Sequence, residues 1–330
     1  MSLESPLEVI YKTINDSQIT TDIYLPSPNT TDGKHYYPVV IDIHGGAFML
    51  GHSRMVSKDQ IRDCLDRGWI VVVPNHRLCP QVNILEGPIQ DCRDLLRWIY
   101  DGHLDAVLAG KEDTAKFSCD LDRVIAFGTS SGGTIALSLG YDVERPVAAI
   151  YDLYGPAKFS DPFWTAELPH VAAKLPPGLT TEFINQVYQE HPVPTRGGVS
   201  LEGQAESRGG PDFSDPRQAF ALTQIAQGKV IHACYPPDNR GPIDPVENIS
   251  PRFPPTFIVH GAKDTMVTIE VSRALFAALK ENGVECDMIE VPDEDHTFAA
   301  KMEVGSRTWN LQRQGFDFLQ RVISKTVSKY

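Results

Sequence analysis

Hydrophobic and polar residues follow two different patterns along this chain. Near its start, two runs in which apolar and polar residues alternate, 7–14 and 19–26, flank a short polar stretch. This arrangement predicts an antiparallel hairpin. Further along, the apolar runs are nearly continuous, which is typical of strands buried on both faces. These runs span residues 37–46, 67–78, 122–128, 147–155, 254–261 and 286–292.

Between these runs, apolar residues recur at the spacing of a helix face. The helical segments are 89–110, the stretch that follows Gly128, 270–283 and 307–325. Buried strands that alternate with helices predict a mostly parallel central sheet with helices on both faces. The expected fold class is therefore α/β.

The alternation is interrupted between Pro156 and about Pro254. This stretch is rich in proline and glycine, contains only short helical pieces, and is too long for an ordinary loop. We therefore expect a single domain over residues 1–330, in which residues 156–254 form a cap or lid inserted after the sixth strand.

Composition and charge narrow the function classes. The 330 residues carry a formal net charge of −13, and an acidic surface repels the phosphates of nucleic acids. No apolar run reaches the roughly 18 residues of a membrane span, and the first residues lack the pattern of a secretory signal. Six scattered cysteines without a Cys-x-x-Cys pair predict free buried thiols and no zinc site. We expect a cytoplasmic protein that binds neither nucleic acid nor membrane.

One apolar run ends in two adjacent serines between glycines. Residues 128–132, Gly-Thr-Ser-Ser-Gly, fit Gly-x-Ser-x-Gly only with Ser130 at the centre, because Thr129 breaks the pattern around Ser131. In a nucleophile elbow the serine occupies a strained turn, where side chains two positions away on either side would collide. The strand before and the helix after fit that context. The pattern predicts Ser130 as a nucleophile; the alternative is a turn whose serine caps the helix.

A second glycine turn, residues 44–48 (HGGAF), follows an earlier strand. Acyl transfer needs N–H donors aimed at the oxyanion that develops, and consecutive glycines let a loop turn its amides towards one point. We expect the amides of Gly45, Gly46 and Ala47 to be such donors. The amide of Ser131, at a helix N-terminus, would be the other donor. The alternative is a tight turn without chemistry.

Several motifs together resemble one superfamily. They are HGGAF, VVVPNHRLCPQ, FGTSSGG, IVHGAKDTMV and DEDHTF. The chain resembles the α/β-hydrolase superfamily, and within it the hormone-sensitive-lipase-like esterases and related carboxylesterases, over nearly its whole length apart from the cap. Ala47 departs from the family's His-Gly-Gly-Gly loop, but an alanine still supplies a backbone N–H. The family's YRLAPE appears as HRLCPQ, and neither change removes a catalytic atom.

The resemblance also implies a base and an acid, which a serine needs because its hydroxyl is a poor nucleophile. In this fold the order along the chain is serine, acid, histidine. Asp264, in the loop after 254–261, is the implied acid, and His296, after 286–292, is the implied base. Asp264 would fix the tautomer of His296 and stabilise its charged form.

Other residues compete for these roles. Asp264 could instead cap the helix that follows, a role that Thr268 could also fill. The acidic run 293–295 lies in the same loop as the implied base and is expected to be a solvated turn. His260 ends a strand but comes too early in the chain to be the base. His44 is expected to support the glycine loop by hydrogen bonding.

The expected reaction is serine esterase catalysis on a small-molecule ester, with no metal or organic cofactor implied. Phe48 and Met49 after the glycine loop, and Phe163 and Trp164 in the cap, are candidates for an apolar substrate pocket, with core packing as the alternative for each. We expect a small to medium apolar ester, lactone or acetylated metabolite rather than emulsified lipid.

Other functions stay open at this point. Proteins similar to this one act as amidases, acyltransferases or cyclases with the same catalytic groups. A ligand receptor of the same fold is a further alternative, although receptors of this family lack the histidine and this chain has all three residues. Esterases that resemble this chain often dimerise, so a homodimer is possible.

Overall fold

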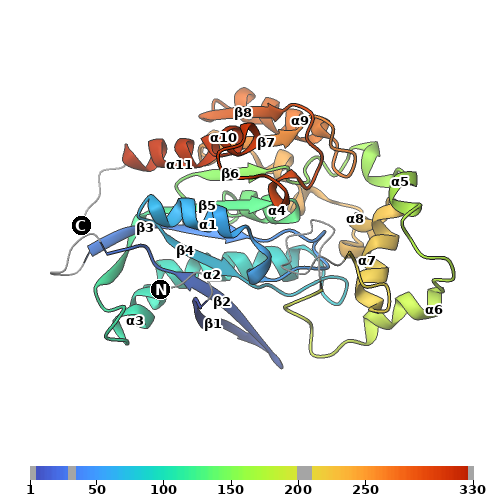
Figure 1. The fold of residues 1–330 in the computed structure, drawn as a ribbon, viewed down its shortest axis with the longest axis horizontal. Helices are drawn as coiled ribbons and strands as arrows, with labels where there is room; N and C mark the ends of the chain where they lie inside the picture. Colours follow the sequence, from blue (N-terminus) through green and yellow to red (C-terminus); the bar gives the residue numbers. More distant parts are fainter. Residues whose placement is uncertain (1–4, 29–34, 199–209, 326–330) are drawn as a thin grey trace.

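The computed structural model describes residues 5–28, 35–198 and 210–325, and its centre is one eight-stranded sheet (Figure 1). The strands lie in the order β1-β2-β4-β3-β5-β6-β7-β8. Their bounds are β1 Leu7–Ile14, β2 Ser17–Tyr24, β3 His35–Ile43, β4 Ile70–Pro74, β5 Phe117–Thr129, β6 Ile150–Leu153, β7 Thr256–Gly261 and β8 Cys286–Val291.

The pairing of the strands confirms the predicted sheet. β1 and β2 form the expected antiparallel hairpin, and β2 also pairs antiparallel with β4. From β4 through β3, β5, β6 and β7 to β8, each neighbouring pair is parallel. The carboxyl ends of six parallel strands therefore meet at one edge of the sheet, where active sites of such folds are found.

Helices cover both faces of the sheet, and each face has its own buried cluster. One cluster contains residues of α2, α3, α4 and α9, and the other contains residues of α1 and α11. This arrangement explains why the inner strands are apolar throughout: all five residues of β4 are buried. The helices span α1 Lys58–Asp66, α2 Gln90–Tyr100, α3 His103–Ala109, α4 Ser131–Ser138, α9 Ile269–Glu281, α10 Arg307–Gln312 and α11 Gln314–Ser324.

Two segments expected as single helices are each divided in the structure. The segment 89–110 breaks at Gly102, whose φ of +81° is a left-handed conformation that a helix does not contain. The segment 307–325 is likewise divided, at Arg313. Apolar spacing continues across both breaks, so the pattern alone did not reveal them.

Residues 156–254 connect β6 to β7. The described part contains short helices: η3 Pro162–Thr165, α5 Pro169–Ala172, α6 Thr181–Ile184, η4 Asn185–Gln189, α7 Pro216–Ala226, α8 Val230–Cys234, η5 Gly241–Ile243 and η6 Pro245–Asn248. Helices α5 to α8 stand together beside one end of the sheet, at the right of Figure 1. That these residues act as a cap over the site stays a prediction.

One buried arginine ties this segment to the sheet domain. Arg217 of α7 donates hydrogen bonds to the carbonyl oxygens of Met49 and Cys79, both at 2.7 Å. The same guanidinium forms a two-pronged ion pair with Glu190 and a hydrogen bond to Gln81. Because the planar guanidinium donates to several acceptors at once, it holds α7 in a fixed position relative to the backbone at Met49 and Cys79.

All six cysteines are buried and none of them forms a disulfide, as the sequence predicted. None of the helices in the described ranges combines the length and hydropathy that a bilayer-spanning helix needs.

Candidate active site

The turn from β5 to α4 holds Ser130 in an unusual backbone conformation, with φ of +53° and ψ of −129°. A Cβ added to Gly128 would lie 2.2 Å from the carbonyl oxygen of Gly132. A Cβ added to Gly132 would lie 2.1 Å from the carbonyl oxygen of Ile43. Both flanking positions therefore require glycine, which explains the Gly-x-Ser-x-Gly spacing.

Ser130, His296 and Asp264 form one line of hydrogen bonds. Ser130 Oγ lies 2.8 Å from His296 Nε2, and His296 Nδ1 lies 2.6 Å from Asp264 Oδ2. The three residues are 5%, 6% and 9% exposed. They follow β5, β8 and β7, so the carboxyl edge of the sheet brings them together. The side chain of Ser130 does not cap α4, although the residue stands at the N-cap position.

The carboxylate of Asp264 is held on both oxygens. Oδ1 accepts the backbone N–H groups of Met266 and Val267, each at 2.8 Å, while Oδ2 faces His296. Burial by itself would raise the pKa of Asp264, but the interactions with His296 and His260 outweigh burial and hold that pKa well below its ordinary value. Asp264 therefore stays ionised and can stabilise an imidazolium.

Thr268 and the acidic run 293–295 lie outside this line of hydrogen bonds. The N-cap of α9 is Thr268, so Asp264 is not the cap of that helix. Asp293 pairs with Lys263 and Asp295 with Lys301, and all four side chains are well exposed. The acidic run before His296 is thus a solvated turn, as expected.

Two contacts of the site were not foreseen from the sequence. His260 Nε2 lies 2.9 Å from Asp264 Oδ2, so the acid has a second histidine partner. The ring of Tyr154 packs against His296, with ring centroids 4.9 Å apart. The Tyr154 contact depends on how the end of β6 meets the loop after β8, and the His260 contact depends on the turn after β7 that brings Asp264 back to the strand end. Hydrophobic patterning marks neither of them.

The glycine loop after β3 adopts a strained course. Gly46, Ala47 and Phe48 have φ values of +123°, +53° and +64°. The N–H groups of Met49 and Leu50 donate to the carbonyl oxygen of Gly46, which closes a tight turn. Consecutive residues in this region of φ cost energy and are characteristic of functional loops.

The loop and the elbow meet at the same cavity. Gly46 and Ala47 line the cavity together with Ser130. Among described residues outside helices and strands, no backbone–backbone hydrogen bond engages the amides of Gly46 or Ala47, and Ser131 is the first residue of α4, where an amide has no partner within the helix. That they form an oxyanion hole with Gly45 stays a prediction.

His44 supports this loop and does not reach the serine. Its Nδ1 hydrogen-bonds with the carbonyl oxygen of Gly45 at 2.7 Å, and its ring stacks on His76 with centroids 4.5 Å apart. Burial, followed by the nearby His76, lowers the pKa of His44 well below its ordinary value. A neutral, buried ring is consistent with the expected structural role.

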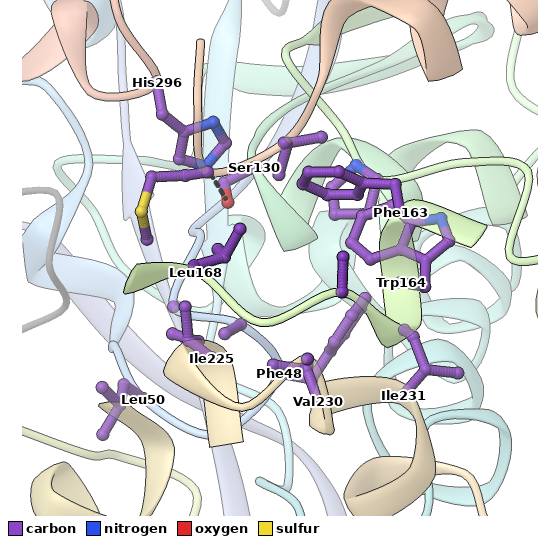
Figure 2. Close-up of a pocket in the computed structure, with 17 residues that line it drawn as sticks. Phe48, Leu50, Ser130, Phe163, Trp164, Leu168, Ile225, Val230, Ile231 and His296 are labelled. Atoms are coloured by element: carbon purple, nitrogen blue, oxygen red, sulfur yellow. Dashed lines mark hydrogen bonds between the residues drawn. The ribbon is translucent and has the colours of Figure 1, made fainter. Parts of the chain in front are cut away.

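The cavity beside Ser130 is almost entirely apolar (Figure 2). The space between its lining residues amounts to about 770 Å³, a volume that includes open solvent at its mouth. Its lining residues are Gly46, Ala47, Phe48, Leu50, Ser130, Pro156, Phe163, Trp164, Ala166, Leu168, Ile225, Gly228, Val230, Ile231, Met266, Val267 and His296. Ser130 and His296 lie together at one side, and Phe163 and Trp164 extend beside them.

Three of the four predicted pocket residues line this cavity: Phe48, Phe163 and Trp164. The prediction for Met49 is wrong. Its side chain is fully buried in the hydrophobic core, and Leu50 lines the cavity instead. Met49 and Leu50 are consecutive residues of the tight turn after Gly46, and their side chains lie on different sides of it, Met49 in the core and Leu50 at the cavity.

Within the described residues, no group of three or more histidine, cysteine, aspartate or glutamate side chains is arranged to hold a metal ion.

Two family models match the chain. One, described as BD-FAE, matches residues 21–175, and the other, the prolyl oligopeptidase family, matches residues 235–326. The first match contains Ser130 and the glycine loop, and the second contains Asp264 and His296.

Solved structures share the fold. A protein of unknown function from Staphylococcus aureus aligns with a TM-score of 0.66 at 20% identity, covering 96% of this chain and 99% of that one. Esterase 2 of Thermogutta terrifontis, phosphoramylated by tabun, aligns with a TM-score of 0.61 at 14% identity, covering 98% and 96%. These matches confirm the expected α/β-hydrolase architecture.

Fungal synthases are similar to the chain over most of its length. A non-reducing polyketide synthase of Preussia isomera is 29% identical over 332 residues, which is 94% of this chain and 14% of that protein. Methylphloroacetophenone synthase of Cladonia uncialis is 28% identical over 360 residues, 95% of this chain and 13% of that protein. The chain thus spans about one seventh of the length of the curated relatives it matches.

Proposed function

We propose that the chain is a serine hydrolase of the α/β-hydrolase superfamily, which cleaves small to medium apolar carboxylic esters or lactones. The single observation that carries this proposal is the hydrogen-bonded line from Ser130 through His296 to Asp264, which opens into an apolar cavity. The same hydrogen-bonded arrangement of serine, histidine and carboxylate performs acyl transfer on several unrelated folds, whatever the order of the residues along the chain.

In the proposed reaction, Ser130 Oγ attacks the ester carbonyl while His296 Nε2 takes its proton. Asp264 accepts the N–H of His296 Nδ1 and stabilises the imidazolium. The amides of Gly46, Ala47 and Ser131, with Gly45 beside them, would hold the oxyanion. His296 then protonates the leaving alcohol, and water, activated in the same way, releases the acid and frees Ser130.

The lining of the cavity supports an uncharged, apolar acyl group. Apart from His296, no residue that lines it carries an ionisable side chain, so a charged acyl group would lose its hydration without a partner. Esterase 2 of Thermogutta terrifontis, which shares the fold, has been solved with butyrate and with propionate bound. We therefore expect short acyl chains to be accepted here.

A thioester is the second candidate substrate, and the similarity to non-reducing polyketide synthases favours it. Polyketides are assembled as acyl thioesters. A serine acyl-enzyme can transfer such an acyl group to water, to an alcohol or to a nucleophile within the polyketide itself. The products would be an acid, an ester or a lactone. Incubation with an aromatic acyl-N-acetylcysteamine thioester, followed by mass spectrometry, separates these outcomes from plain ester hydrolysis.

The decisive experiment combines labelling with turnover. A fluorophosphonate probe is expected to label the wild-type protein at Ser130, and p-nitrophenyl esters of increasing acyl length are expected to be hydrolysed. Ser130→Ala should abolish labelling and lower kcat by at least about 10⁴-fold. Ser131→Ala keeps its backbone amide and should lose far less.

Two results would count against the proposal. Full turnover by Ser130→Ala would show that another group performs the chemistry. A folded wild-type protein that neither labels nor hydrolyses any ester or thioester would favour a receptor that kept the fold without catalysis.

A further inference from the structure

Asp264 is shared between two histidines. Its Oδ2 lies 2.6 Å from His296 Nδ1 and 2.9 Å from His260 Nε2. His260 stands near the end of β7 and is completely buried, so water does not compete for this contact. The reaction outlined above uses His296 and leaves His260 without a role.

The surroundings of His260 fix its tautomer. Its Nε2 faces two acceptors, Asp264 Oδ2 and the carbonyl oxygen of Val267 at 2.8 Å, so Nε2 carries a proton. Its Nδ1 lies 2.7 Å from Ser272 Oγ, in α9. In the neutral ring, Nδ1 accepts the Ser272 hydroxyl proton, and every polar atom of the imidazole is satisfied.

Packing holds both imidazoles in place around the carboxylate. The ring of Tyr154 contacts the two of them, with centroids 4.9 Å from His296 and 6.4 Å from His260. Since Oδ1 of Asp264 is occupied by two backbone N–H groups, the described donors to Oδ2 are the two imidazoles. Without His260, one side of Oδ2 would be left unpartnered in a buried site.

We propose that His260 is a positioning residue, which holds Asp264 Oδ2 in line with His296 Nδ1. Its N–H fixes the rotation of the carboxylate and takes up part of its charge, so that His296 keeps both its orientation and its strength as a base. The inference rests on the proposed function, because it concerns the same triad. It adds Ser272 and His260 to the line that ends at Ser130.

The test compares two substitutions at one position. His260→Leu removes the donor, whereas His260→Gln retains an amide N–H near the position of Nε2. Val259→Ala is the matched control: it lies next to His260 on β7 and is fully buried, but its side chain belongs to the cluster on the other face of the sheet. The readouts are kcat and KM for p-nitrophenyl butyrate, the rate of fluorophosphonate labelling, and the urea midpoint.

His260→Leu is expected to lower kcat and the labelling rate by about 10- to 100-fold, the range for a hydrogen bond to a charged group, while KM stays unchanged. His260→Gln should recover most of this loss, and Val259→Ala should lose stability but not kcat. If His260→Leu does not fold, Ser272→Ala replaces it, and a smaller loss of kcat with unchanged KM is expected.

The proposal is overturned if folded His260→Leu keeps the wild-type kcat, or if His260→Gln is no faster than His260→Leu. It is also overturned if Val259→Ala loses kcat to the same extent, since general loosening would then explain the effect. Where Ser272→Ala is the variant tested, an unchanged kcat has the same meaning. An inactive, unlabelled wild type is a separate result, which refutes the proposed function itself.

Discussion

A buried carboxyl on β3 makes stability depend on pH in a calculable way. Asp42 is 2% exposed, and its Oδ1 has no hydrogen-bond partner among the described residues. Burial raises the pKa of Asp42 from 3.8 to about 8. The substitution Asp42→Asn keeps the shape of the side chain and removes its ability to ionise.

The size and sign of the effect follow from linkage. An unfolded chain releases the Asp42 proton near pH 4, whereas the folded protein retains it until about pH 8. Between these values the folded state loses about 1.4 kcal/mol of stability for each pH unit, and above them the loss levels off. The total is about 6 kcal/mol, a large part of the 5–15 kcal/mol that is typical of a folded domain.

Urea unfolding monitored by tryptophan fluorescence at pH 4, 5, 6, 7 and 8 measures this loss of stability. Asp42→Asn should be about as stable as wild type near pH 4 and several kcal/mol more stable at pH 8. The exposed Asp287 provides the control, since Asp287→Asn should leave the curve unchanged. Parallel curves for wild type and Asp42→Asn from pH 5 to pH 8 would refute the reasoning.

Three further substitutions test the elbow, the anchor and the cavity. Gly132→Ala places a Cβ 2.1 Å from the carbonyl oxygen of Ile43, so it should abolish fluorophosphonate labelling. It should also lower the free energy of unfolding, measured in urea, by several kcal/mol. Gly110→Ala is the control and should be tolerated, because that position has room for a Cβ. Arg217→Met removes the buried guanidinium and should cost about 3 kcal/mol, measured as a lower thermal midpoint; an unchanged midpoint would contradict the anchoring role. Trp164→Ala enlarges the cavity and should shift the preferred p-nitrophenyl ester to a longer acyl chain; an unchanged preference would exclude Trp164 from the acyl site.

Much of the fold was accessible from the sequence because it depends on local pattern. A run that is apolar throughout can be stable only where both faces are covered, so the inner strands could be placed before any tertiary contact was known. The break at Gly102 was missed for the converse reason. The apolar spacing continues through it, and only the backbone conformation shows that α2 has ended.

The same distinction separates the site residues that could be predicted from the sequence from those that could not. Ser130 follows from glycine spacing because the collisions that demand glycine occur within a few residues and across the adjoining strand end. Leu50, which lines the cavity in place of Met49, and His260, which contacts Asp264, could not be predicted in this way. The first depends on a left-handed turn at non-glycine residues, and the second on the turn after β7 that brings Asp264 back to His260.

The loop that is expected to bind the oxyanion depends on residues distant in sequence. Ala47 and Phe48 hold positive φ values, and each non-glycine residue in that conformation costs about 1–2 kcal/mol. Arg217 offsets this strain, because its guanidinium donates to the carbonyl oxygen of Met49, directly after the strained pair. Arg217 belongs to α7, and Ile225 of the same helix lines the cavity. A displacement of α7 would therefore also move the carbonyl group of Met49, and with it the loop that is expected to bind the oxyanion.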